Sequence, residues 1–357
     1  MMSRNASVIT RCAEAVASDA VLGVYLYVRH DGETVTHAAF GEAEPGVAAA
    51  TTDLGELRCA VKPLTTLCLA RAMEAGLLGP DDTLARWTPA GTPPRIAAIS
   101  LRQLLAHASG LPNLLGVDVY AVGFDEYVAR ILRPEYPPIG WDAQPIYNIA
   151  GAWHLLAWVV QQVYGQPIQH VVAEHVTGPL GLSTMALVAP AASPLPCHRP
   201  TGGGGYTAVR LTDPATFAAR PNPAYGGFAT VGDLGRLYEH LMECSSDGGL
   251  LRRDTMRLLL HRGEGVSFQA RATRLPFGLG FFLGGAAAGF GSEWDADCFG
   301  HMGSVMRYYT TAALCAPERR TVVAVRLSSV GLGTNAFLES LGRAIHRDLG
   351  LPDGTDG

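Results

Sequence analysis

The sequence contains a single lysine: 26 of its 27 basic residues are arginine, and the exception is Lys62. It also has no C-x-x-C pair, no internal repeat, and no apolar run near the roughly 18 residues that a membrane span requires. Arginine stays protonated in proteins, whereas a lysine amine can be tuned into a base. The lysine is therefore a candidate for chemistry that arginine cannot perform.

The charge balance and the cysteine pattern exclude several classes of partner. A net charge of -5 gives no basic surface for nucleic acid or anionic membranes. Residues 1–20 have no apolar core of the signal-peptide type. The seven scattered cysteines favour free thiols in a reducing cytoplasm over a disulfide framework. We expect a cytoplasmic protein without a metal or a cofactor, because Cys298-x-x-His301 has metal-like spacing but no partners.

The order of predicted elements indicates an α/β fold. Strands are predicted at 21–29, 35–41, 277–283, 305–314 and 320–328. Helices are predicted at 59–78, 100–107, 124–132, 149–164 and 335–349, with a further helix starting at Thr230-x-x-Asp233. We expect one antiparallel sheet flanked by helices (residues 1–80 and 225–357), an inserted, mostly helical domain (81–224), and the active site in the cleft between them.

Cys59 and Lys62 form the strongest candidate for chemistry. A spacing of three places both side chains on one face of a helix. A helix N-terminus and a neighbouring cation both raise the thiolate population of a cysteine. This is the arrangement of an activated nucleophile with its base, whereas most free cysteines are small buried hydrophobic residues.

The segment from Cys59 to Thr65 resembles the Ser-x-x-Lys-Pro-[FL]-T segment of class C β-lactamases and related esterases, D-aminopeptidases and transesterases. Four further stretches resemble motifs of the same penicillin-recognising family, in the same order along the chain: residues 101–112, 178–185, 226–234 and 300–303. The resemblance covers nearly the whole chain. It implies a β-lactamase/transpeptidase-like fold and an acyl-transfer activity.

The resemblance also implies roles for residues near the end of the chain. The oxyanion hole would consist of the backbone N–H groups of Cys59 and Ser304, which follows His301-x-Gly303. His301 replaces the lysine of the K-T-G motif and would border the pocket, with Gly303 as a substrate-binding position. The family's loop motif accounts for His107 and Ser109 as structural residues.

The tyrosine motif Y-x-N of the family is irregular in this chain. Counting back from Gly165 puts Asn148 at the tyrosine position, as a residue facing the substrate. A shift of one residue restores Tyr147 as a catalytic group but leaves Ile149 in place of the asparagine. Tyr147 as a packing residue is the alternative.

Cysteine in place of the family's serine changes the expected reaction. A thioester favours attack by an amine over attack by water, so we expect an ATP-independent transacylase that moves an acyl group from an ester donor to an amine acceptor. An antibiotic-pathway transacylase of the capuramycin type is one such family member. A plain esterase or amidase and an inactive ligand-binding member are the alternatives, and an engineered serine-to-cysteine exchange would give the same sequence. Pocket walls are expected from 113–120, 200–225 and 284–297.

Overall fold

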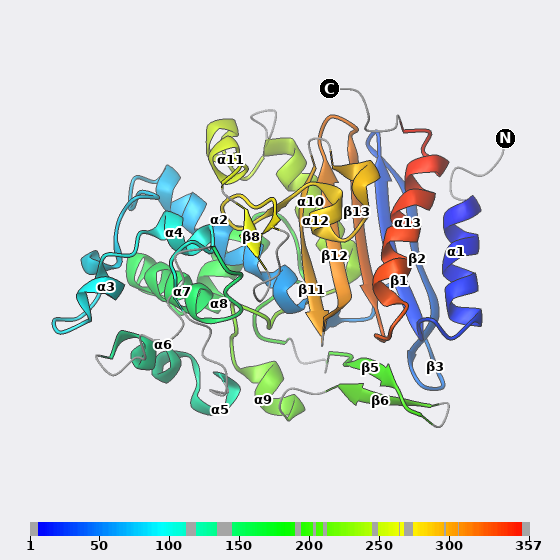
Figure 1. Cartoon of the computed structure of the whole chain (residues 1–357), viewed down its shortest axis with the longest axis horizontal. Coiled ribbons are helices and arrows are strands. Elements are labelled where there is room, and N and C mark those ends of the chain that lie inside the picture. The colour runs from blue at the N-terminus through cyan, green and yellow to red at the C-terminus, as the bar shows by residue number, and fades with distance from the viewer. Residues whose placement is uncertain are drawn as a thin grey trace.

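The first and last strands of the chain pair with each other in the computed structural model (Figure 1). The structure describes residues 6–111, 119–133, 145–189, 194–202, 205–209, 213–244, 249–263, 265–267, 274–295, 298–305 and 307–351. Seven antiparallel strands follow the order β10–β11–β12–β13–β1–β2–β3. Their bounds are Phe282–Leu283 (β10), Phe299–Val305 (β11), Tyr308–Ala316 (β12), Thr321–Leu327 (β13), Gly23–His30 (β1), Glu33–Glu44 (β2) and Val47–Ala48 (β3). The predicted antiparallel sheet is confirmed.

Strand β1 shows why this sheet is buried on both faces. Tyr25 and Tyr27 join one hydrophobic cluster, whereas Val24, Leu26 and Val28 join a second one on the opposite face. Helices α1 (Ala6–Ala17), α13 (Thr334–Asp348) and α12 (Gly285–Ala288) lie on the second face. Helix α10 (Val231–Glu243) packs on the first face, against β1, β12 and β13.

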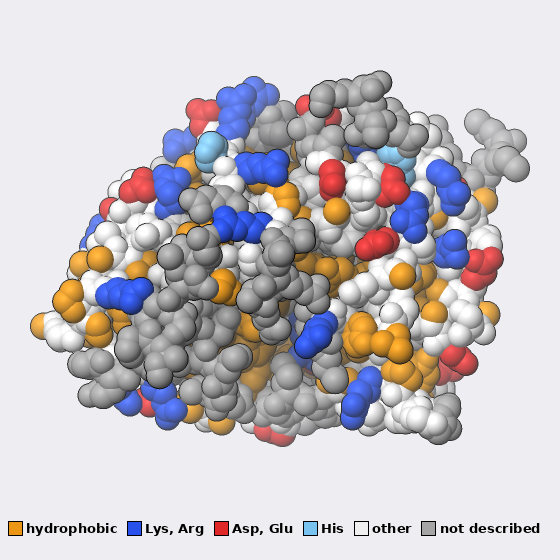
Figure 2. Space-filling model, in the orientation of Figure 1, with side chains coloured by type: hydrophobic (Ala, Val, Ile, Leu, Met, Phe, Trp, Pro, Cys, Tyr) orange, Lys and Arg blue, Asp and Glu red, His pale blue; other side chains and the backbone are white. Residues whose placement is uncertain are grey.

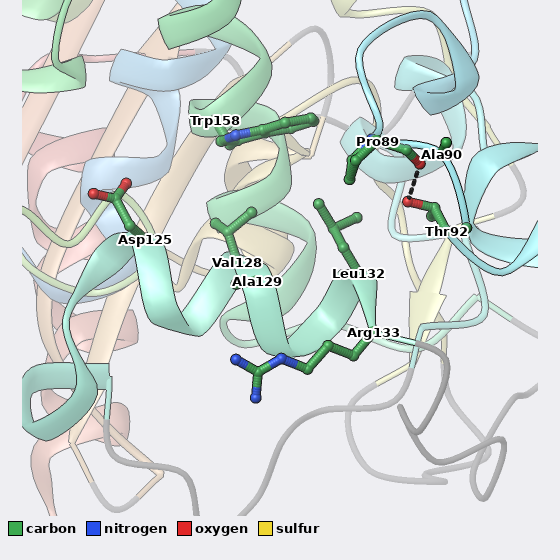
Figure 3. Close-up of a pocket in the computed structure, with 10 residues that line it drawn as sticks. Pro89, Ala90, Thr92, Asp125, Val128, Ala129, Leu132, Arg133 and Trp158 are labelled. Atoms are coloured by element: carbon green, nitrogen blue, oxygen red, sulfur yellow. Dashed lines mark hydrogen bonds between the residues drawn. The ribbon is translucent and has the colours of Figure 1, made fainter.

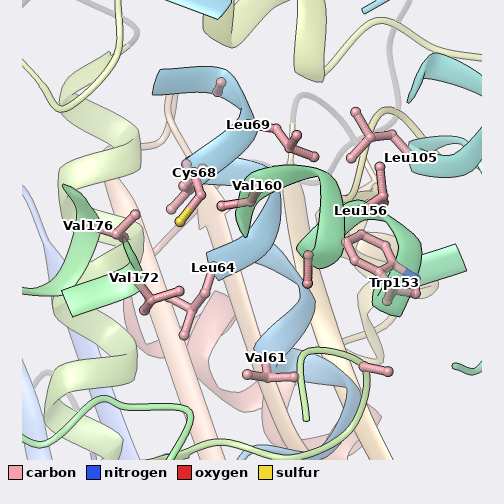
Figure 4. Close-up of a cluster of buried hydrophobic side chains, with 14 of the residues drawn as sticks. Val61, Leu64, Cys68, Leu69, Leu105, Trp153, Leu156, Val160, Val172 and Val176 are labelled. Carbon is pink, nitrogen blue, oxygen red and sulfur yellow. The ribbon is translucent and has the colours of Figure 1, made fainter. Parts of the chain in front are cut away.

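Helix α2 (Lys62–Glu74) runs through the larger cluster. It packs against α7 (Gly151–Tyr164), and Figure 4 shows Cys68 of α2 beside Val160 of α7. A 3₁₀ turn, η1 (Arg58–Val61), leads into α2, so the chain is helical from the position predicted for the start. Pro63 lies in the first turn of α2, where its missing N–H costs no hydrogen bond.

The remaining elements are short and surround these layers. The helices are η2 (Leu84–Arg86), α3 (Pro94–Ala97), α4 (Leu101–Leu105), α5 (Val119–Val122), α6 (Phe124–Leu132), α8 (Ile168–Val172), the π-helical turn η3 (Ala173–Thr177), α9 (Pro214–Ala219), α11 (Arg253–Leu259) and η5 (Ser292–Trp294). Three two-stranded ladders are β4–β7 (Gly55–Glu56, Phe228–Ala229), β5–β6 (Cys197–Pro200, Tyr206–Val209) and β8–β9 (Val266–Ser267, Arg274–Leu275). The β5–β6 hairpin is attached to the end of β13 through the His198 N–H, which donates to Ser328 O.

Two predicted strands differ from the structure. Most of 277–283 turns rather than extends, because Gly280 has a φ of +91° and its backbone lies directly against Thr66. The predicted strand 305–314 is wrong at its start: β11 ends at Val305, Arg307 has a φ of +78°, and β12 begins at Tyr308. Glycine is the residue that usually indicates a positive φ. Because arginine takes this position here, nothing in the sequence indicates the turn.

The Thr230 side chain caps α10 as predicted, accepting a hydrogen bond from the Asp233 N–H. Asp233 does not complete a capping box, because its carboxylate instead accepts hydrogen bonds from the Thr184 N–H and hydroxyl. Acidic and basic side chains are interspersed on the face seen in Figure 2. Among the described residues, no helix combines the length and apolarity needed to cross a bilayer.

Candidate active site

Cys59 lies in the 3₁₀ turn immediately before α2. The residue before it, Arg58, has a φ of +53°, a conformation that few non-glycine residues adopt. Arg58 is buried and ion-paired with Glu56, which holds this strained turn in place. Cys59 is partly exposed, whereas the six other cysteines are buried. The local chain therefore presents one thiol to solvent at the start of a helix.

Lys62 is fully buried, and backbone carbonyls surround its amine. The Nζ atom donates to Ile149 O at 3.2 Å and to Ala224 O. It also lies 5.2 Å from the centre of the Tyr147 ring, and no carboxylate in the described part of the chain forms an ion pair with it. Burial lowers the pKa of Lys62, and the neighbouring Cys59 opposes this shift. Burial thus favours the neutral amine beside the Cys59 thiol.

Tyr147, rather than Asn148, lies beside this pair. Its side chain is buried in the hydrophobic cluster against which Cys59 packs. Burial, and secondly the charge of Cys59, raise the pKa of Tyr147 well above its ordinary value. The phenol therefore stays protonated, and its hydroxyl can act as a hydrogen-bond donor beside the sulfur.

Asn148 is bonded within the fold instead. Its Nδ2 atom donates to Leu111 O at 2.9 Å, and its Oδ1 atom accepts the Ala152 N–H at 3.0 Å. The second bond satisfies a backbone N–H in the first turn of α7. The structure does not bring this amide, predicted as substrate-binding, to the Cys59 thiol.

Strand β11 lies against the turn that carries Cys59. A Cβ added at Gly303 would lie 2.3 Å from Leu57 O and 3.3 Å from the Cys59 nitrogen, so only glycine permits this approach. On the side of β11 that faces β10, only Phe299 and Gly300 are paired. Among the described strands, none pairs with the rest of that edge beyond Gly300. A bulge follows at Gly303/Ser304. Ser304, predicted to supply the second oxyanion-hole N–H, thus follows the glycine that packs on the Cys59 backbone.

His301 is fully buried among aromatic rings. Its ring centre lies 5.1 Å from that of Phe282 and 6.4 Å from that of Tyr147. Burial, followed by the charge of Lys62, lowers the pKa of His301 to about 3. The Nδ1 atom lies 2.9 Å from Met302 O, which can only accept, so Nδ1 carries the hydrogen. The residue that the resemblance aligns with the K-T-G lysine is thus a neutral imidazole in this structure.

The carbonyl groups of Ile149 and Ala224 are site components that the sequence did not reveal. Main-chain oxygens leave no side-chain pattern, and Ala224 is 162 positions from Lys62. The one available signal was Asn222-Pro, typical of a turn. The Asn222 Oδ1 atom accepts the N–H groups of Ala224 and Tyr225, which fixes the loop that carries the Ala224 carbonyl.

A hollow in the described part of the chain lies away from these residues. It has a volume of about 590 Å³ and lies between α6 and residues 89–92, with Trp158 in its wall (Figure 3). Its lining is mostly apolar, and neither Cys59 nor Lys62 contributes to it. No group of three or more His, Cys, Asp or Glu side chains among the described residues is placed to bind a metal ion.

Comparison with known proteins gives a consistent assignment. The family described as Beta-lactamase matches residues 9–345. Esterase EstB of Burkholderia gladioli is 25% identical over 306 residues, which cover 74% of this chain and 76% of EstB. Penicillin-binding protein 4* of Bacillus subtilis (strain 168) is 28% identical over 165 residues, 43% of this chain and about a third of that protein's length (35%).

A solved structure shares the fold over almost its full length. EstCE1, described as a hydrolase with promiscuous acyltransferase activity, superposes with a TM-score of 0.78. The sequences are 20% identical, and the match covers 96% of this chain and 98% of that one. At this level of identity the likeness establishes the β-lactamase/transpeptidase-like fold.

Proposed function

Because the chain belongs to the beta-lactamase family, which it matches over residues 9–345, we propose that it is an acyltransferase that works through a thioester on Cys59. The family comprises hydrolases, esterases and acyltransferases of this fold. One observation carries the proposal: the partly exposed Cys59 thiol lies beside a buried lysine, Lys62, and a buried, protonated tyrosine, Tyr147. The donor is a small ester and the acceptor is a small amine.

The first half-reaction forms the thioester. The neutral Lys62 amine takes the thiol proton, and the sulfur attacks the ester carbonyl to form the S–C bond. The oxyanion is stabilised by the backbone N–H groups of Cys59 and Ser304, and removal of one such donor in other enzymes costs about 3–4 kcal/mol. As the C–O bond breaks, the proton held by Lys62 passes to the leaving alkoxide, directly or through the Tyr147 hydroxyl.

The second half-reaction releases the acyl group. The acceptor amine attacks the thioester carbonyl, a C–N bond forms and the C–S bond breaks. The amine gives up its proton to Lys62, which returns it to the sulfur, so no ATP and no redox partner is consumed. Attack by water in place of the amine would give hydrolysis. The esterase name of the relative EstB supports hydrolysis as the second candidate.

The test measures how the acyl-enzyme is divided between water and an amine. A p-nitrophenyl ester is incubated with and without a primary amine, and the amide and the free acid are quantified. We expect amide to dominate with the native chain and acid to dominate with Cys59→Ser, whose ester intermediate discriminates less against water. Acid release that no amine changes would leave the hydrolase as the function.

Intact-mass measurement tests the nucleophile separately. The native chain is expected to gain the mass of one acyl group, and Cys59→Ala is expected to gain none. An adduct that persists in Cys59→Ala would place the nucleophile elsewhere. No adduct with any activated ester would support a ligand-binding protein without activity.

A further inference from the structure

His107 lies directly against the Tyr147 ring, although nothing in the proposed reaction uses it. The two ring centres are 4.3 Å apart, and the planes are stacked at 30°. The His107 side chain is 2% exposed, and Phe277 contacts its ring edge-on at 4.9 Å. Tyr147 also stacks on Phe282 at 5.9 Å. The phenol beside Cys59 therefore lies among rings that leave it little rotational freedom.

His107 also holds the backbone next to this tyrosine. Its Nδ1 atom accepts the N–H of Asn148 at 2.9 Å, so Nδ1 carries no hydrogen and the ring is neutral. Burial lowers the pKa of His107, and the neighbouring Lys62 and His301 lower it further. Protonation of Nδ1 would remove the acceptor and break the bond to Asn148. The His107 ring thus contacts residues 147–148 in two ways: it stacks on the Tyr147 ring, and it accepts the backbone N–H of Asn148.

The backbone at His107 has a φ of +55°, which few side chains adopt. The conformation follows directly after α4, and it turns the imidazole towards a segment 40 positions later in the chain. Asparagine, aspartate and histidine are the non-glycine residues most often found with a positive φ. Histidine meets three requirements of this position. It tolerates a left-handed backbone, its flat ring stacks on Tyr147, and its nitrogen accepts the Asn148 N–H.

We infer that His107 is a positioning residue that holds the Tyr147 side chain, and with it the hydroxyl, beside the Cys59 sulfur through ring stacking and the Asn148 backbone bond. This inference rests on the role of Tyr147 proposed above. His107 does not touch the reacting atoms. Substitution of His107 is expected to affect the reaction only through Tyr147. This dependence distinguishes His107 from a residue that merely stabilises the fold.

A double-mutant cycle tests this dependence. His107→Phe retains a ring for stacking but removes the acceptor, and His107→Asn retains an acceptor that suits a positive φ. We expect His107→Phe to lower kcat by about tenfold or more with little change in KM, because a small misplacement is enough to cost this much. His107→Asn is expected to recover part of the loss. In a Tyr147→Phe background, His107→Phe is expected to change kcat less than twofold, since no hydroxyl remains to be positioned.

A second readout needs no turnover, so failure of the proposed function and failure of this inference can be distinguished. The rate of Cys59 alkylation by iodoacetamide at pH 7 reports the surroundings of the sulfur. His107→Phe and Tyr147→Phe are expected to change this rate to the same extent, and the double variant no further. If the native chain cleaves no ester, this cycle alone decides.

The matched control is His154→Phe, because His154 is an equally buried histidine whose ring packs on Phe124 and Tyr127. It is expected to leave both readouts near the native values. Equal losses in the two His→Phe variants, or multiplicative effects of His107→Phe and Tyr147→Phe, would overturn the inference. If His107→Phe does not fold, the cycle is run with His107→Asn, whose smaller effect must likewise vanish in the Tyr147→Phe background.

Discussion

The Nζ atom of Lys62 lies 5.2 Å from the centre of the Tyr147 ring, and Cys59 neighbours both side chains. The two partners are shifted in opposite directions: burial lowers the pKa of the lysine and raises that of the tyrosine. Both shifts favour the uncharged forms. A lysine shifted in this direction is more readily the neutral amine, which can accept a proton, and the protonated tyrosine can donate a hydrogen bond.

Replacement of the lysine is predicted to abolish acylation even when the charge is kept. Lys62→Arg cannot provide a neutral base, so the rate of acyl-enzyme formation should fall by roughly 10²–10⁴-fold. The rate of acyl-enzyme formation should fall to a similar extent in Lys62→Met, which removes the charge. Rapid-quench intact-mass measurement gives the rate, and circular dichroism checks the fold. Retention of more than a tenth of the native rate in Lys62→Arg would contradict the assignment of Lys62 as the base.

Alkylation is predicted to be selective for Cys59. The other six cysteines are buried, and burial raises the pKa of Cys12 and of Cys197 to about 12, which leaves almost no thiolate at pH 7. One equivalent of iodoacetamide should modify Cys59 and abolish acylation in parallel. Peptide mapping after partial labelling identifies the modified residue. Faster labelling of any other cysteine would speak against an activated thiol at position 59.

The sequence predicted the parts of the site that depend on local spacing. Cys59 and Lys62 are three residues apart, so a single helical turn brings them together without help from the rest of the fold. One antiparallel sheet of the terminal strands, which includes the β1–β13 pair, was expected because strands are predicted at both ends of the chain. The role of Tyr147 was harder to predict, because the position of its ring depends on packing against His107 and β10. Counting along the chain left Asn148 equally possible.

Other features carried no sequence signal. The carbonyl groups around Lys62 come from Ile149 and Ala224, whose side chains are irrelevant to that contact. The turn between β11 and β12 uses an arginine at positive φ, so a continuous strand was predicted through it. Helix α1 was not predicted from its polar sequence, and Asp348 of α13 caps it by accepting the N–H groups of Ser7 and Val8. Each of these depends on contacts between distant segments.

The buried histidines predict a loss of stability in mild acid. The pKa of His154 is lowered to about 4 and that of His301 to about 3, in both cases chiefly by burial. Between these values and 6.5 the unfolded chain binds protons that the folded chain does not. The free energy of unfolding should therefore fall as pH decreases from about 6.5 towards 4, by up to about 1.4 kcal/mol per pH unit for each such histidine.

Urea denaturation at pH 7, 6 and 5 measures this dependence. His154→Gln removes one titrating group from the interior, so its stability should depend less steeply on pH than that of the native chain. The comparison uses the slope rather than the stability itself, because the substitution also changes packing. Parallel curves for the two proteins would show that His154 does not titrate as its burial implies.

The approach of β11 to the nucleophile predicts that Gly303 tolerates no side chain. In Gly303→Ala the new Cβ would lie 2.3 Å from Leu57 O, so the strand must move away from the turn that carries Cys59. We expect a loss of about 1–3 kcal/mol in stability from overpacking and a fall of about 10²-fold in acylation rate, because the Cys59 and Ser304 N–H groups separate. Gly202→Ala, where the new Cβ meets no atom within 4 Å, is the matched control and should leave both unchanged. Stability is measured by urea denaturation and acylation by intact mass. A Gly303→Ala variant that loses stability but acylates at the native rate would show that β11 does not contribute to the oxyanion hole.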